Sequence, residues 1–393
     1  MSNIRRIAVG VAVAALLGAT LLYTGGAELA SAKPAQHAKQ AGPQHIFLIM
    51  MENHGFNEII GNRKDAPYIN WLAAHNPMAT NYFGVTHPSL PNYLATFSGS
   101  FQGIWDDCRV WVAAPYGASS TCPPEEFIRG TGDGTDGNYL TKGQIASASR
   151  RPHLFNARNL VDQLEARGLT WKAYMQSIPS VGSQVEYAPT RAGTIYKLYA
   201  QKHDPFMYFA DINHRGSARL KKIVPYKTLA RDLSSGAVPN FVWISPNQCR
   251  DMHGTDAPSG IALGIPKCGY PDSGLDHGAI KLGDSFLKSA VSQITSSRVW
   301  KTTNSSIVIT WDEDDYTGIA GCCHSPRGVH GVVLGGSRVP TIVINSEGGG
   351  AHRSHVRSNH YTLLATIEHL WNLGCLANSC KIPQSGLLTS LFH

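Results

Sequence analysis

The sequence predicts an α/β fold of three layers, in which a mostly parallel central sheet carries helices on both faces. Short apolar runs recur at His45 to Met51, Phe241 to Ile244, Ser306 to Trp311 and Pro340 to Ile344. Runs of this length without alternating polar residues are typical of strands that are buried on both faces, as in parallel sheets. Segments with helical spacing lie between them, and this alternation favours a layered α/β domain.

Three segments repeat apolar residues at the spacing of an amphipathic helix. The stripes are Leu160, Val161 and Leu164; Phe286, Leu287, Ala290, Val291 and Ile294; and Leu363, Leu364, Ile367, Leu370 and Trp371. We interpret these stripes as the faces that pack on the sheet. Gly168 and Gly374 follow the first and the last stripe, where we expect them to end the helices.

The N-terminus has the pattern of an export signal. Arg5 and Arg6 precede an apolar run over residues 7–22, and small residues at 30–32 offer a cleavage site. The alternative is an uncleaved membrane anchor, but the run is short for a bilayer span and contains glycine. We therefore expect a signal peptide over 1–32, a flexible leader over 33–44 and a single domain over 45–393 with a surface excursion at about 102–150. The mature protein would be secreted, without stable insertion in the membrane.

Eight cysteines follow this signal, and an even number in an exported chain indicates disulfides. Proximity along the chain favours three pairs: Cys108 with Cys122, Cys249 with Cys268, and Cys375 with Cys380. Cys322 and Cys323 form a vicinal bridge or pair elsewhere. A zinc site at these two cysteines is not indicated, because no CxxC spacing surrounds them.

The formal charge of +7 suits an anionic substrate. The basic residues are scattered rather than clustered, so a nucleic-acid partner is not expected.

Polar side chains follow three of the predicted strands at the point where each strand ends. Glu52 and Asn53 come after the first strand, Asp251 follows the strand at 241–244, and Asp312 and Glu313 follow the strand at 306–311. Ligands in open parallel sheets bind beyond the carboxyl ends of the strands, where these side chains would meet. An ordinary polar turn or a solvated acidic loop is the simpler reading of each cluster alone. Together the three turns predict a metal site.

The ligand types restrict the metal without selecting one. Carboxylates and an amide oxygen suit Ca²⁺, Mg²⁺ or Mn²⁺, whereas histidines at 253 and 360 would admit Zn²⁺ or iron.

Ser89 is the candidate nucleophile, in the segment THPSLPNY. Pro91 suits a first helical turn, and the following YLATFS predicts a short helix ended by Gly99, which places Ser89 at or near the N-cap. A capping serine is the simpler reading, but a helix N-terminus also stabilises a phosphate and a developing alkoxide. The chain has no GxSxG elbow and no P-loop, so we expect activation of Ser89 by a metal.

Seven segments in order resemble the bacterial phosphoesterase family of secreted acid phosphatases and phospholipases C, part of the alkaline-phosphatase-like superfamily. They are ENHGFNEIIGN, APYINWLAAH, THPSLPNYLATFSG, PNQCRDMHG, ITWDEDD, VPTIVIN and SNHYTLLATIEHLWNL. The resemblance covers much of the chain from His45 to Leu373 and is weak from 102 to 240. It is closest to the small secreted acid phosphatases that act on phosphomonoesters, including phosphoinositides, and it implies an alkaline-phosphatase-like sheet.

The resemblance also implies roles for individual residues. Glu52, Asn53, Asp312 and Glu313 are similar to metal ligands, Ser89 to the residue that is transiently phosphorylated, Asn92 to a group that holds phosphoryl oxygens, and His253 to a catalytic residue; Asp251 and His360 would contact the substrate or a second metal. The chain departs from the family at His54, where many members have arginine, and in its long excursion.

Three functions fit this sequence. The first is a phosphomonoesterase acting on a phosphorylated small molecule or a lipid head group, and the second is a phospholipase C. The second needs an apolar entrance, which five aromatic residues would supply unless they are packed in the core: Trp105, Trp111, Tyr116, Phe206 and Tyr208. The third is a noncatalytic binding protein, which would have lost the serine or an acidic ligand.

Overall fold

The structure is a computed structural model that describes residues 42–110, 123–129, 139–148, 153–269 and 277–392. Residues Gln40–His393 form one compact unit. The predicted signal peptide and most of the leader lie outside the described residues, as do parts of the excursion. Within the described ranges, no helix has both the length and the apolar character needed to cross a membrane.

A nine-stranded sheet forms the centre of this unit, in the order β10-β2-β9-β8-β1-β7-β3-β6, with β11 also paired to β2. The strands are β1 (His45–Met51), β2 (Met78–Phe83), β3 (Trp171–Met175), β6 (Ile223–Pro225), β7 (Phe241–Ser245), β8 (Ser305–Trp311), β9 (Arg338–Asn345), β10 (Arg353–Ser354) and β11 (Ser358–Asn359). All four apolar runs of the sequence are strands of this sheet.

The sheet is mostly parallel, as predicted. β1 pairs in parallel with both β7 and β8, and β3 pairs in parallel with β7 and β6. The run from Pro340 to Ile344 differs, because β9 is antiparallel to both of its neighbours, β8 and β2. An apolar run reports burial on both faces and not strand direction, so the sequence could not distinguish the two cases.

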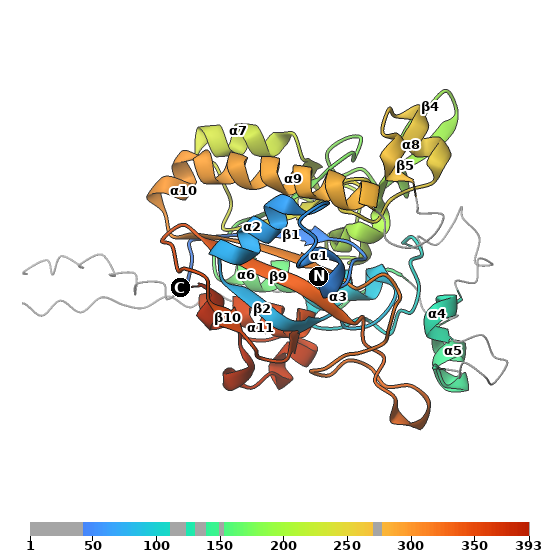
Figure 1. The fold of residues 1–393 in the computed structure, drawn as a ribbon. Helices are drawn as coiled ribbons and strands as arrows, with labels where there is room; N and C mark the ends of the chain where they lie inside the picture. The colour runs from blue at the N-terminus through green and yellow to red at the C-terminus, as the bar shows by residue number, and fades with distance from the viewer. Residues whose placement is uncertain (1–41, 111–122, 130–138, 149–152, 270–276, 393) are drawn as a thin grey trace, which may run out of the picture. The chain divides into compact units, whose positions relative to one another are not determined.

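Helices cover both faces of the sheet, which confirms the three-layer fold (Figure 1). One layer contains α2 (Pro67–His75), α7 (Thr228–Ser235), α9 (His277–Ser296) and α10 (Arg298–Thr302); the other contains α3 (Ser89–Ser98), α6 (Leu160–Ala166) and α11 (His360–Trp371). A hydrogen bond from Gln163 to Glu368 joins α6 to α11 at 2.9 Å. The three predicted stripes are the buried faces of α6, α9 and α11.

Helix α3 begins at Ser89 and ends where Gly99 adopts a left-handed conformation, with φ of 69°. A Cβ atom at Gly99 would lie 2.0 Å from the carbonyl oxygen of Leu376, so glycine is required both by conformation and by space. Helix α11 ends earlier than predicted, because Asn372 already takes the left-handed C-cap conformation two residues before Gly374.

Smaller elements complete the unit. They are the helices α1 (Phe56–Ile59), α4 (Glu126–Arg129), α5 (Lys142–Ala148) and α8 (Ala257–Ala262), the hairpin of β4 (Tyr187–Arg191) and β5 (Thr194–Ala200), and the 3₁₀ turn η1 (Gln201–His203) that follows it. The described part of the excursion has its own small core, made of Trp105, Ile128, Leu140 and Ala148 with Leu334 from outside it.

Three disulfides join described cysteines. Cys249–Cys268 and Cys375–Cys380 are paired as expected from their proximity, and Cys322–Cys323 form a vicinal bridge. The expected bridge from Cys108 to Cys122 involves a residue outside the described ranges.

Candidate active site

The three acidic turns meet at one edge of the sheet, because β8, β1 and β7 are adjacent and parallel. The backbone N–H of Asn53 donates to Asp312 Oδ1 at 3.1 Å, which joins the turn after β1 to the turn after β8. The N–H of Glu52 donates to the carbonyl oxygen of Asp251 at 2.8 Å, which joins it to the turn after β7. The predicted clustering of these turns is therefore found in the structure.

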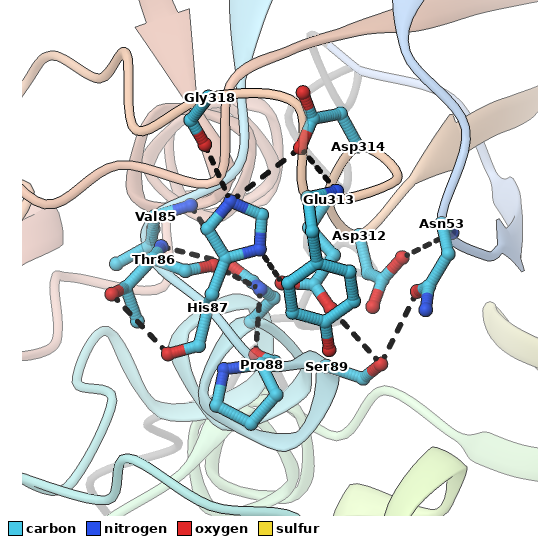
Figure 2. A network of polar contacts seen from close by, with 12 residues as sticks. Asn53, Val85, Thr86, His87, Pro88, Ser89, Asp312, Glu313, Asp314 and Gly318 are labelled. Carbon is cyan, nitrogen blue, oxygen red and sulfur yellow. Dashed lines mark hydrogen bonds and ion pairs between the residues drawn. The ribbon is translucent and has the colours of Figure 1, made fainter. Parts of the chain in front are cut away.

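Ser89 reaches this edge from the first turn of α3 and is fully buried. Its Oγ lies 3.0 Å from Glu52 Oε2. The same oxygen lies 3.3 Å from both Asn53 Oδ1 and Glu313 Oε1 (Figure 2). The Nζ atom of Lys202, on η1, lies 3.4 Å from the same oxygen. Ser89 does not cap its own helix: the N-cap is Pro88, and the Ser89 side chain is turned toward the acidic residues.

The oxygen atoms around Ser89 fit a cation. A serine hydroxyl has one proton and can donate it to only one of the three surrounding acceptors. Asp312 Oδ2 is also buried and has no hydrogen-bond partner among the described residues. Acceptor oxygens without donors are costly to bury unless a positive charge compensates them. Carboxylate and amide oxygens are ligands that hard divalent cations prefer.

Burial disfavours the charged form of each carboxylate in this cluster. It raises the pKa of Asp312 to about 6. Burial, with the nearby charges of Asp312 and Asp251, raises the pKa of Glu52 well above its usual range. Burial and the charge of Asp312 do the same for Glu313. Metal sites commonly show this pattern in the absence of the ion, because the cation is the group that would stabilise the ionised form.

A second group of side chains lies beside Glu52. Glu52, His203 and His253 offer ligand atoms that are all within 4.8 Å of one another, so the three residues could hold a metal ion. His203 Nε2 lies 3.2 Å from Glu52 Oε1, and His203 Nδ1 lies 3.1 Å from Asp251 Oδ2. The hydroxyl of Tyr93, from α3, donates to Glu52 Oε1. Burial is the main reason that the pKa values of His203 and His253 are well below the usual value, so both are neutral.

Asn92 stabilises the turn before Ser89 through hydrogen bonds to its backbone. Its Oδ1 accepts from the backbone N–H groups of Val85 and Thr86 at 2.7 and 3.2 Å. Its Nδ2 donates to the carbonyl oxygens of Thr86 and Pro88 at 2.7 and 3.1 Å. These four bonds fill the hydrogen-bonding capacity of an amide. Asn92 therefore positions the turn that carries Ser89, and its contact with phosphoryl oxygens stays a prediction.

His360 contacts the backbone of the acidic turn after β8. Its Nε2 donates to the carbonyl oxygen of Asp312 at 2.7 Å, and its Nδ1 accepts from the hydroxyl of Tyr82 at 2.9 Å. Burial lowers the pKa of His360 to about 4, so the ring is neutral and both nitrogens are engaged. The hydrogen bond from Nε2 fixes the position of the Asp312 backbone. A contact of His360 with substrate or a second metal stays a prediction.

Asp251 and His253 lie beside Glu52 and His203, at the end of the sheet where their position after β7 predicted them. Asp251 Oδ1 accepts from the backbone N–H of His253 at 2.8 Å. His54 is buried, and its Nδ1 donates to the carbonyl oxygen of Glu52 at 3.1 Å. This histidine therefore supports the backbone of the acidic turn.

Sequence reasoning gave no role to several residues that contact this site, among them Tyr93, Asp107, Lys202 and His203. Lys202 and His203 follow the β4–β5 hairpin, in a part of the chain where no period or motif marked a function. Asp107 belongs to the excursion. Tyr93 was visible only as part of an apolar helix pattern. No local signal in the sequence connects these residues with Ser89, because the fold alone brings them together.

The sequence pattern of the Phosphoesterase family matches residues 62–264 and 269–374. The chain is 27% identical over 356 residues to a phosphatidylinositol-3-phosphatase of Mycobacterium tuberculosis, covering 88% of this chain and 80% of that protein. It is 22% identical to a probable acid phosphatase of Kluyveromyces lactis and 20% identical to an acid phosphatase of Aspergillus fumigatus. These two alignments cover 84% and 87% of this chain but only 58% of each fungal protein.

Solved structures also resemble this one. A protein of the alkaline phosphatase superfamily from Vibrio parahaemolyticus has a TM-score of 0.44 and 11% identity, covering 86% of this chain and 68% of that one. A phosphonate monoester hydrolase of Agrobacterium radiobacter has a TM-score of 0.41 and 12% identity, covering 84% and 74%.

The family pattern and the sequence relatives define a phosphoric ester hydrolase. The family pattern matches well over half of the 393 residues, and the chain belongs to the Phosphoesterase family.

The support that Asn92 gives to the Ser89 turn is testable. We expect Asn92→Ala to lower the free energy of unfolding by about 2 kcal/mol or more, because buried N–H groups lose their acceptor. Hydrolysis of p-nitrophenyl phosphate should fall on the order of 100-fold, because the nucleophile turn shifts.

Asn70→Ala is the matched control for this variant. The Asn70 side chain also makes four hydrogen bonds to backbone groups, at Gly61, Ile59, Asn62 and Ala66, but it lies in α2. It should lower stability without a comparable loss of kcat. Equal losses of activity in the two variants would show that Asn92 acts only through overall stability.

Proposed function

We propose that this protein is a phosphomonoesterase of the acid phosphatase type that works through a phosphoserine at position 89. The observation that carries the proposal is the surrounding of the buried Ser89 Oγ by Glu52, Asn53 and Glu313 within 3.3 Å. A serine in this setting, at a helix N-terminus, is oriented as a nucleophile toward an anionic substrate.

The first step forms a bond from Ser89 Oγ to phosphorus while the bond to the leaving oxygen breaks. Glu52 Oε2, at 3.0 Å, accepts the hydroxyl proton, and the leaving alkoxide takes a proton from solvent. In the second step water attacks phosphorus, the bond to Ser89 breaks, and the proton returns from Glu52 to the serine oxygen. The products are an alcohol and inorganic phosphate.

A divalent cation held by Glu52, Asn53, Asp312 and Glu313 would stabilise negative charge on the serine and phosphoryl oxygens. The chain's own residues prepare this position. The N–H of Asn53 orients Asp312 through Oδ1, and the tyrosine hydroxyl of Tyr93 orients Glu52. The donor set suits Ca²⁺, Mg²⁺ or Mn²⁺, and Zn²⁺ where a histidine joins it.

Several observations favour a phosphomonoester over a lipid phosphodiester. Among the aromatic residues that an apolar entrance would need, Trp105, Phe206 and Tyr208 are buried in the protein core, and Trp111 and Tyr116 lie outside the described residues. The phosphatidylinositol-3-phosphatase and acid phosphatase relatives are named for monoester chemistry. Phosphoinositides are therefore candidate substrates, and phospholipase C activity is the alternative.

Export is also part of the proposal. The signal pattern over 1–32 supports it, and the three disulfides among described cysteines are consistent with an oxidising compartment. We propose that the signal peptide is removed, that 33–44 is a flexible leader, and that 45–393 act as one phosphoesterase domain.

Ser89→Ala should lower kcat for p-nitrophenyl phosphate on the order of a thousandfold or more, because the covalent step is lost. Acid-quenched wild-type enzyme should contain phosphoserine at position 89 by peptide mass spectrometry. Ser98→Ala, at the other end of α3, is the control and should remain active, since its hydroxyl bonds only to local groups. A Ser89→Ala variant with a tenth of the wild-type rate would remove Ser89 from the mechanism.

Removal of the metal should abolish activity reversibly and lower the melting temperature, because the acidic cluster then loses its counter-ion. Asp312→Asn should reduce metal content by elemental analysis. Asp232→Asn is the control, since Asp232 is a similarly buried carboxylate that pairs with Lys172 instead. A metal-free enzyme with full activity and an unchanged melting temperature would refute the metal requirement.

Measurements of kcat/KM for monoester and diester substrates, made with the same metal ion, distinguish the two substrate classes. We expect p-nitrophenyl phosphate and phosphatidylinositol 3-phosphate to release phosphate much faster than phosphatidylcholine releases diacylglycerol. A compact monoester head fits the oxygens and cation around Ser89, whereas a diester needs room for a second substituent. A higher kcat/KM for diacylglycerol release would favour the phospholipase reading instead.

A further inference from the structure

Lys202 makes three contacts in the candidate active site. Its Nζ lies 2.6 Å from Asp107 Oδ2, 3.1 Å from His253 Nε2 and 3.4 Å from Ser89 Oγ. Its side chain is only 10% exposed. An ammonium group has three N–H donors and no acceptor, so these contacts can use each donor once. One of the three donors is thereby directed at the reacting oxygen.

The contact with His253 determines what the neighbouring residues can bind. His253 Nδ1 donates to the carbonyl oxygen of Gly254 at 2.9 Å, so Nε2 is the ring nitrogen that carries the lone pair. The Lys202 ammonium occupies that lone pair. A metal held by Glu52, His203 and His253 would have to bind the same lone pair, at about 2.1 Å. The ammonium and such a metal therefore exclude each other.

Asp107 fixes the ammonium relative to the nucleophile. Its Oδ2 accepts from Lys202, and its Oδ1 accepts from the backbone N–H of Leu90 at 2.9 Å. Leu90 directly follows Ser89, so one carboxylate holds both the cation and the first turn of α3. This arrangement orients Lys202 before any substrate binds, which is the condition for electrostatic stabilisation without reorganisation.

We propose that Lys202 is a catalytic residue that supplies the second positive charge of the active site, in the place where Glu52, His203 and His253 would otherwise bind a second metal. The ammonium remains protonated and donates to the serine oxygen and to a phosphoryl oxygen while the Ser89 ester forms and breaks. Asp107 is its positioning residue. The enzyme then works with one metal ion and one ammonium, and the proposal rests on the proposed phosphatase function.

The side chains around Ser89 explain why a fixed cation is needed there. Of the four side chains that contact Ser89 Oγ, Glu52 and Glu313 are acidic, Asn53 is neutral and Lys202 is positive. A dianionic phosphate that enters this cluster meets carboxylate charge, which repels it. The charge of Lys202 offsets that repulsion next to the serine oxygen.

The test measures metal content and phosphate binding as well as turnover. Wild-type enzyme loaded with excess Zn²⁺ or Mn²⁺ and dialysed should retain one equivalent by elemental analysis. Lys202→Met, which keeps the length of the side chain without its charge, should lower kcat at least 100-fold. In the Ser89→Ala background, where no turnover occurs, Lys202→Met should weaken binding of inorganic phosphate at least tenfold by calorimetry. Lys202→Arg should recover part of both losses.

Lys172→Met is the matched control, because Lys172, in β3, also pairs with an aspartate, Asp232 of α7. It should change neither metal content nor phosphate affinity. If Lys202→Met does not fold, Asp107→Asn replaces it and should lower kcat and phosphate affinity in the same direction, since the ammonium loses its orientation.

Three results would overturn the inference. They are two equivalents of metal in the wild type, a Lys202→Met enzyme within threefold of the wild-type kcat, and a loss of kcat with unchanged phosphate affinity. Failure of the proposed function is distinguishable from these, because it would appear as an active Ser89→Ala enzyme or a wild type without phosphatase activity.

Discussion

The burial of several carboxylates around one serine is the constraint on which the site depends. Glu52, Asp312 and Glu313 are fully removed from solvent, and burial raises the pKa of each. A protein of ordinary stability does not hold such a cluster together without compensating positive charge. The parallel pairing of β8, β1 and β7 holds the carboxylates together against their mutual repulsion, because it fixes the backbone from which these side chains emerge. The geometry of the sheet thus brings the carboxylates together, and a bound cation would stabilise their ionised forms.

Much of this could be predicted from the sequence, for a physical reason. A buried parallel strand is visible in the sequence as an apolar run. The residues that follow it lie at the carboxyl end of the strand, where ligands bind in such sheets. Glu52, Asp251 and Asp312 were found in this way, and the family resemblance added a role for Ser89. Strand β9 shows the limit of the same signal, because its apolar run predicts burial but not its antiparallel direction.

The rest could not be predicted because it depends on contacts between distant segments. Lys202 meets Asp107 across 95 residues, and neither lies in a recognisable motif. Asn92 and His360 show a related limit, because residue type does not reveal which groups a side chain contacts. Asn92 is bonded to backbone groups of the Ser89 turn, and His360 is bonded to the carbonyl oxygen of Asp312 and to the hydroxyl of Tyr82.

The histidines of the site do not supply the positive charge that would compensate the carboxylates. Burial lowers the pKa of His203, His253 and His360, so these rings are neutral and cannot offset the carboxylates beside them. Asn53 is also neutral. Positive charge next to Ser89 therefore has two sources, a bound cation among the acidic oxygens and the ammonium of Lys202. Lys202 contacts both Ser89 Oγ and His253 Nε2, while Glu313 and Asn53 contact the same serine oxygen. The nucleophile thus contacts both the oxygen atoms that would hold a metal and a fixed cation, and positive charge near the transferred phosphoryl group is what phosphoryl transfer requires.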